Sequence, residues 1–135
     1  MTTNYVDYHK HLEERLTQLG RELPGPTLAP ALRSGASAGV TGFARLRKKT
    51  VEDGALNAKT KELMALAVGV AVRCEGCIAY HVHDAVAARA TRQELIETIG
   101  VAIMMGGGPA AMYAAHALDA IEQLLPRSPE AASGQ

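Results

Sequence analysis

The spacing of apolar residues limits this chain to a helical fold. Apolar side chains recur every three or four positions over residues 5–23, 27–49 and 58–73 and again after residue 91, as on one face of a helix. No stretch alternates apolar and polar residues for long enough to predict a strand, and no segment repeats. We therefore expect an all-α fold of five to seven helices, with a single domain over residues 1–125 and a flexible tail over residues 126–135.

Local signals predict several helix ends. The prolines of residues 23–26 end the first helix, and Asn57 is a suitable N-cap for the helix that begins at residue 58. Thr91 and Glu94 have the spacing of a capping box. Residues 106–109, Gly-Gly-Gly-Pro, lack the lysine and the Ser/Thr of a phosphate loop, so they predict a turn between the last two helices.

Residues 63–72 form a continuous apolar stretch. It is apolar around the whole helix circumference, which predicts a central helix buried on every side. The stretch is about half the roughly 20 residues that a membrane-spanning helix needs, so we expect no membrane span.

Composition narrows the function classes. With 14 basic and 14 acidic residues the net charge is zero, and aromatic residues make up 4% with no Trp, so nucleic-acid binding is not expected. Residues 1–8 lack a secretory signal, which favours the cytoplasm. The only two cysteines, Cys74 and Cys77, close too small a loop to stabilise a secreted domain and instead suggest redox chemistry or metal binding.

The segment from Cys74 to His81 carries the candidate chemistry. On a helix, Cys77 and His81 are four residues apart and share a face, with Cys74 one turn earlier. A thiolate is the reactive form of cysteine, and a helix N-terminus or a nearby imidazole favours it. These residue types at this spacing therefore predict an activated thiol.

Glu62 joins the same site only if the chain reverses. In one unbroken helix Glu62 and His81 would lie roughly 28 Å apart, at about 1.5 Å per residue. A reversal within residues 73–76, which Gly76 would permit, brings the carboxylate to the imidazole ring and orients it. The proposed proton path then runs from Glu62 through His81 to a cysteine.

Other interpretations of these residues remain open. Glu62 is also explained as an acid near the positive end of its own helix, and the two cysteines as small buried hydrophobic residues. Zinc is a further alternative, with Cys74, Cys77 and His81 as ligands and a fourth from His83 or His116. A thioredoxin-like domain is excluded because it needs strands. The remaining histidines are interpreted as ordinary surface or interface residues: His9, His11, His83 and His116.

The succession Glu62, Cys74, Cys77 and His81 resembles the signature of the AhpD-like alkylhydroperoxidases, a branch of the carboxymuconolactone decarboxylase superfamily. The resemblance covers roughly residues 58–125, including the Gly-Gly-Gly-Pro-Ala-Ala-Met-Tyr-Ala segment. It implies an AhpD-like helical domain that assembles into homo-oligomers, either trimers or hexamers.

The resemblance also implies a role for each matching residue. Cys77 would attack the hydroperoxide and become a sulfenic acid, Cys74 would resolve it as a disulfide, and His81 and Glu62 would relay the proton. The implied partners are an organic hydroperoxide and a dithiol electron donor, such as a lipoyl protein, with a peroxiredoxin as a further partner. No cofactor or resident metal is implied.

The chain departs from the best-known AhpD proteins between its cysteines, where Glu75 and Gly76 replace a segment containing histidine. The cysteine pair favours a peroxidase or disulfide reductase over lactone decarboxylation, which does not need it. A carboxymuconolactone decarboxylase-like enzyme and a non-peroxidase oligomer that binds a metal or a small ligand are the alternatives.

Overall fold

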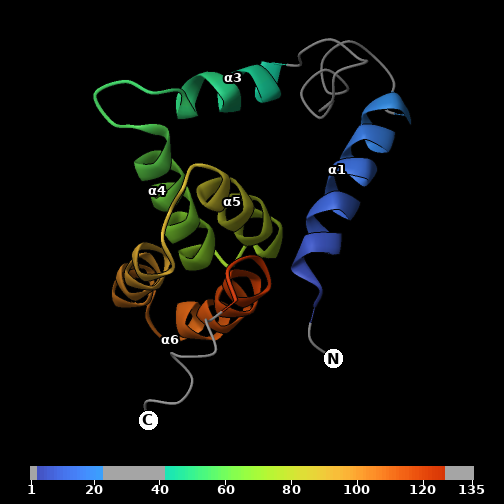
Figure 1. The fold of residues 1–135 in the computed structure, drawn as a ribbon. Coiled ribbons are helices and arrows are strands. Elements are labelled where there is room, and N and C mark those ends of the chain that lie inside the picture. Colours follow the sequence, from blue (N-terminus) through green and yellow to red (C-terminus); the bar gives the residue numbers. More distant parts are fainter. Residues whose placement is uncertain (1–2, 23–41, 127–135) are drawn as a thin grey trace.

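A computed structural model describes residues 3–22 and 42–126, and these residues form helices with no strand among them (Figure 1). The prediction of an all-α fold is confirmed. The predicted helix over residues 27–49 lies largely outside the described residues, as does the predicted tail over residues 126–135. The helices are α1 (Tyr5–Glu22), α3 (Gly42–Val51), α4 (Ala58–Ala71), α5 (Glu75–Ala87) and α6 (Arg92–Leu124).

The predicted helix caps are confirmed at two places. The side chain of Asn57 accepts the backbone N–H of Thr60 at 2.8 Å and caps α4. At the start of α6, Thr91 accepts the N–H of Glu94, and the Glu94 carboxylate accepts the N–H of Thr91 in return. Each cap satisfies amides that have no partner inside the helix.

The glycine segment in α6 is the predicted turn between two helices. Gly107 has φ 70° and ψ −158°, a conformation that is essentially restricted to glycine, and it divides α6 into two differently directed halves. By length and composition alone α6 contains a window apolar enough to cross a membrane, with a mean hydropathy of 1.4. Because the turn interrupts the helix, this window does not indicate a membrane protein.

Replacing Gly107 with alanine is expected to destabilise the protein by about 1–3 kcal/mol, since a Cβ atom strains this backbone conformation. Gly108→Ala is the matched control. An added Cβ meets nothing within 4 Å at either position, and Gly108 has no positive φ, so its replacement is expected to be neutral or stabilising by up to about 1 kcal/mol. Urea unfolding of both variants measures the difference, and equal stabilities would contradict the assigned turn.

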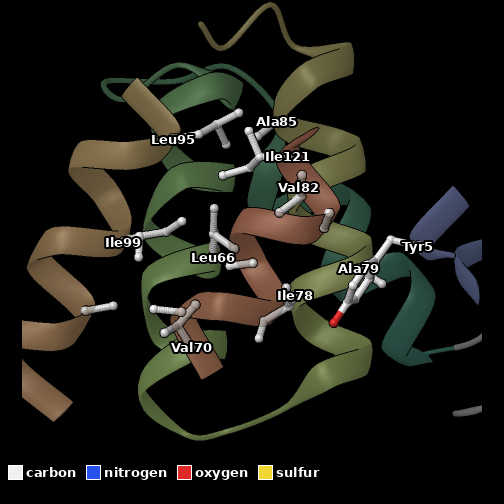
Figure 2. Packing of buried hydrophobic residues seen from close by; sticks show 14 of the residues in the cluster. Tyr5, Leu66, Val70, Ile78, Ala79, Val82, Ala85, Leu95, Ile99 and Ile121 are labelled. Carbon is white, nitrogen blue, oxygen red and sulfur yellow. The ribbon is translucent and has the colours of Figure 1, made fainter. Parts of the chain in front are cut away.

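The core is aliphatic and lies between α4, α5 and both halves of α6 (Figure 2). The second half of α6 contributes mainly small residues, which lets its backbone approach the other helices closely. Tyr5 joins the core from α1. The larger buried side chains are Leu66 and Val70 of α4, Ile78 and Val82 of α5, and Leu95, Ile99 and Ile121 of α6.

The prediction that the central helix is buried on every side is wrong for the described chain. Met64, Val68 and Val72 are each more than half exposed. They are spaced four residues apart, so they form one apolar stripe on and just beyond α4, opposite the face that Leu66 and Val70 bury. An apolar pattern shows which side chains of a helix are hydrophobic, but it does not show which of them another part of the same chain covers.

Helix α1 is held at its start by the end of α6. The backbone N–H of Tyr5 donates to Gln123 Oε1 at 2.5 Å, and Gln123 Nε2 donates to the carbonyl of Thr3 at 2.6 Å. One amide side chain thus anchors the first turn of α1, which then runs along α5.

Candidate active site

The chain reverses between α4 and α5 through a Schellman motif. Arg73 has φ 61°, its N–H donates to the carbonyl of Val70, and the N–H of Cys74 donates to the carbonyl of Gly69 at 2.9 Å. The predicted reversal is therefore present, although Arg73 and not Gly76 adopts the left-handed conformation. Gly76 lies inside the first turn of α5.

Cys74 is the N-cap residue of α5, and Cys77 lies in the first helical turn. The two form a disulfide with their Cα atoms 5.2 Å apart, and the N–H of Cys77 donates to Cys74 Sγ at 3.2 Å. The positive end of the helix dipole and this N–H group both favour negative charge on sulfur in the reduced state. The local fold therefore supplies the electrostatic conditions of a reactive thiol pair.

The Glu62 carboxylate and the His81 imidazole meet between α4 and α5. His81 Nδ1 lies 2.7 Å from Glu62 Oε2, and Glu62 is only 3% exposed. An ionised carboxylate can only accept, so the ring donates its Nδ1–H and leaves Nε2 as the nitrogen for proton exchange. His81 follows Cys77 by one helical turn. The structure thus brings together Glu62 and His81 on the same helix pair that presents the disulfide.

Gly69 permits the close approach of α4 to the cysteine turn. A Cβ atom at this position would lie 3.1 Å from Cys77 Cβ, tighter than ordinary van der Waals contact. The absence of a side chain thus allows α4 to pack directly against the Cys74–Cys77 disulfide.

Helix α1 covers the cysteine turn from another side, which sequence reasoning missed. A Cβ atom on Gly76 would lie 3.4 Å from Leu12 Cδ1, and the Tyr5 hydroxyl donates to Glu75 Oε1 at 3.4 Å. Burial, and next the charge of Glu75, raise the pKa of Tyr5, so this hydroxyl keeps its proton and remains a donor. No periodic or motif signal in the sequence pairs these two segments.

The structure places His9 between α1 and α5, so of the surface and interface positions expected for it, His9 takes an interface position. The residue is 9% exposed, with its ring stacked on His83 and tilted against Tyr80. Burial is the main cause that lowers the pKa of His9, and the proximity of His83 lowers it further. Burial also raises the pKa of Tyr80 to about 12. Hence His9 is not an ordinary surface residue.

The zinc ligands considered from the sequence do not come together around one point in the described residues. Cys74 and Cys77 are joined to each other, His83 Nδ1 contacts Asp84 Oδ1 at 2.9 Å, and the His116 ring packs on Tyr113. Within residues 3–22 and 42–126, the side chains whose potential metal-binding atoms come together are instead those of His9, His83 and Asp84.

Comparison with known proteins identifies the family. The sequence model of the Carboxymuconolactone decarboxylase family matches residues 39–120. The chain belongs to this family. An uncharacterized protein of Cupriavidus necator is 39% identical over 107 residues, which are 79% of this chain and 89% of that protein.

Two solved structures of carboxymuconolactone decarboxylase family proteins share the fold. The apo protein from Legionella pneumophila is 43% identical, with a TM-score of 0.69 over 90% of this chain and 99% of its own. A protein from Thermotoga maritima, whose name links it to an antioxidative response, is 25% identical, with a TM-score of 0.65 over 90% of each chain. These similarities support the AhpD-like resemblance seen in the sequence.

The family match contains all four predicted site residues but not α1. Glu62, Cys74, Cys77 and His81 lie within residues 39–120, whereas α1 ends at Glu22. The contacts of Tyr5 and His9 therefore join a helix outside the family match to residues inside it.

Proposed function

We propose that this carboxymuconolactone decarboxylase family protein is a thiol-dependent reductase of organic hydroperoxides. The observation that carries the proposal is the Cys74–Cys77 disulfide at the start of α5, one helical turn before the His81 ring that Glu62 holds. Sulfur and imidazole on one helix face provide a nucleophile and its base. The antioxidative response in the name of the Thermotoga maritima protein agrees with this chemistry.

In the oxidative half of the reaction, Cys77 thiolate attacks the terminal oxygen of a hydroperoxide. The O–O bond breaks, Cys77 becomes a sulfenic acid, and the alkoxide leaves and takes up a proton to form an alcohol. Cys74 then attacks the sulfenic sulfur, and water leaves as the disulfide forms. The two thiols lose two electrons in total, and the hydroperoxide gains them.

In the reductive half, an external dithiol restores the two thiols. Its thiolate attacks Cys77 Sγ, and Cys74 leaves as a thiolate, because the N–H of Cys77 and the helix dipole stabilise charge on Cys74 Sγ. The second donor thiol then releases Cys77, and the donor becomes a disulfide. A lipoyl protein is the proposed donor, and a peroxiredoxin is a further proposed partner.

Glu62 and His81 supply the proton path. Neutral His81 takes the Cys77 proton at Nε2, and the buried Glu62 carboxylate stabilises the resulting imidazolium through Nδ1–H. The protonated ring can return that proton to the leaving alkoxide.

We also propose that the protein works as a homo-oligomer, a trimer or a hexamer, in the cytoplasm. The apolar stripe of Met64, Val68 and Val72 supports association, because one chain leaves it open to water. A reducing compartment would supply the dithiols that the reaction consumes.

A thiol count tests the proposed reaction directly. Fully reduced protein is treated with one equivalent of cumene hydroperoxide, and free thiols are counted over time. We expect a fast fall from two thiols to none and a return to two after addition of dihydrolipoamide. Thiols that persist would count against the proposal, and turnover of a lactone acid that survives replacement of both cysteines would support the decarboxylase alternative.

A further inference from the structure

A second cluster of potential metal-binding side chains lies between α1 and α5. It contains His9 of α1 together with His83 and Asp84 of α5, and one ligand atom from each lies within 4.8 Å of the others. At 3.6 residues per turn, His83 is on nearly the opposite side of α5 from His81. The cluster therefore uses different residues from the proposed redox site.

The buried histidine in this cluster has an unsatisfied nitrogen. His9 is more than nine-tenths buried. Its Nε2 atom is inaccessible to solvent and has no hydrogen-bond partner. A buried polar atom without a partner is costly, and proteins rarely retain one without a reason. Coordination of a metal ion through Nε2 would remove that cost.

Asp84, the acidic residue of this cluster, is already held in position by two neighbouring side chains. Asp84 Oδ1 contacts His83 Nδ1 at 2.9 Å, while Asp84 Oδ2 forms an ion pair with Arg47 of α3. Metal-binding carboxylates commonly keep such an outer partner, which fixes their direction. Arg47 can therefore hold Oδ2, and Oδ1 can contact a cation once the His83 ring turns away from it.

We propose that His9, His83 and Asp84 bind a divalent transition-metal ion of the zinc type. Two imidazoles and one carboxylate suit such an ion, with water completing the coordination. Zinc ligands lie about 2.0–2.2 Å from the ion and hence about 3.4 Å from each other in tetrahedral geometry. The three ligand atoms now lie within 4.8 Å of one another, so each pair must approach by at most about 1.4 Å to bind one ion.

Metal binding requires one ring to leave the present stack. The His9 and His83 rings are nearly parallel, at 20° with centroids 4.1 Å apart, and a metal ion must lie close to the plane of each ring that binds it. The His83 side chain is 44% exposed, so its ring can leave the stack into open space, whereas His9 is buried. The ion would thus fix His83 against α1 and join α1 to α5.

Titration with Zn²⁺ and with Co²⁺ tests the site. The protein is first stripped with a chelator and kept in its disulfide form, so that Cys74 and Cys77 offer no thiolate. We expect one Zn²⁺ per chain by calorimetry, visible absorption bands from bound Co²⁺, and a midpoint of thermal unfolding raised by several degrees in excess Zn²⁺.

Substitutions of single residues test which side chains bind the Zn²⁺ ion. His83→Gln and Asp84→Asn, at partly exposed positions, are each expected to weaken Zn²⁺ binding at least about tenfold, as losing a ligand or its orientation does. His11→Gln is the matched control, an exposed histidine on the same α1, and is expected to bind as the parent protein does. Circular dichroism checks that each variant is folded.

Three results would overturn the proposal. The first is that the disulfide form binds no Zn²⁺. The second is that folded His83→Gln and Asp84→Asn bind Zn²⁺ with the affinity of the parent protein. The third is that His81→Gln loses Zn²⁺ binding while His83→Gln keeps it. Peroxide reduction plays no part in these measurements, so failure of the metal site leaves the proposed redox function untouched.

Discussion

Cys77→Ser is expected to reduce peroxide consumption to the background of the buffer. In the proposed reaction Cys77 forms the bond to the peroxide oxygen, and a serine hydroxyl at this position neither ionises readily near neutral pH nor accepts the oxygen. The smaller oxygen atom fits the close packing against Gly69, so the variant should fold. Stopped-flow measurement of hydroperoxide loss against enzyme concentration gives the result.

Cys74→Ser provides the matched comparison and is expected to complete one turnover. Serine is a favourable N-cap, so α5 keeps its start, and Cys77 still reacts to give a sulfenic acid that no thiol resolves. One equivalent of peroxide should disappear per chain, and a dimedone adduct on Cys77 should appear by mass spectrometry. Reversed behaviour of the two variants would assign the nucleophile to Cys74, and equal partial losses would contradict both roles.

The sequence was sufficient for the helical fold because that fold depends on local signals. Asn57, Thr91 and Glu94 cap helices through side chains within three residues, so their positions follow from short patterns. The contact of Glu62 with His81 was conditional on a reversal near residue 73, which the sequence permits but does not require.

The position of the reversal was less predictable, since left-handed backbone usually selects glycine or asparagine and here occurs at Arg73. The Schellman hydrogen bonds of Arg73 and Cys74 compensate for that cost, and they join backbone groups only, so no side-chain pattern in the sequence specifies them.

The contacts of α1 could not be predicted because they join segments about 70 residues apart. Tyr5 meets Glu75, and His9 meets His83, through docking of one helix on another. An amphipathic pattern in α1 shows that one face is apolar, but it does not specify which helix that face meets. The same reason explains why the exposed stripe of α4 was expected to be buried.

Glu62→Gln is expected to slow the first thiol oxidation by about a hundredfold or more, the range of a lost acid–base contribution. Glutamine keeps the shape of the side chain and an oxygen that can accept the His81 Nδ1–H, so only the negative charge is removed. Glu97→Gln makes the same chemical change at an exposed position and should retain the parent rate. Stopped-flow measurement of thiol loss compares the three proteins.

A comparison of rate with thermal stability separates a proton relay from a structural role. In the proposed reaction His81 takes the Cys77 proton, and the Glu62 carboxylate stabilises the charged ring that results, whereas glutamine keeps the contact without the charge. Glu62→Gln should therefore lose rate while it stays folded at the parent unfolding midpoint, and Glu97→Gln should keep both rate and midpoint. A Glu62→Gln protein that loses thermal stability but keeps the parent rate would show that Glu62 only supports the fold, because lost packing alone removes no charge from beside the imidazole.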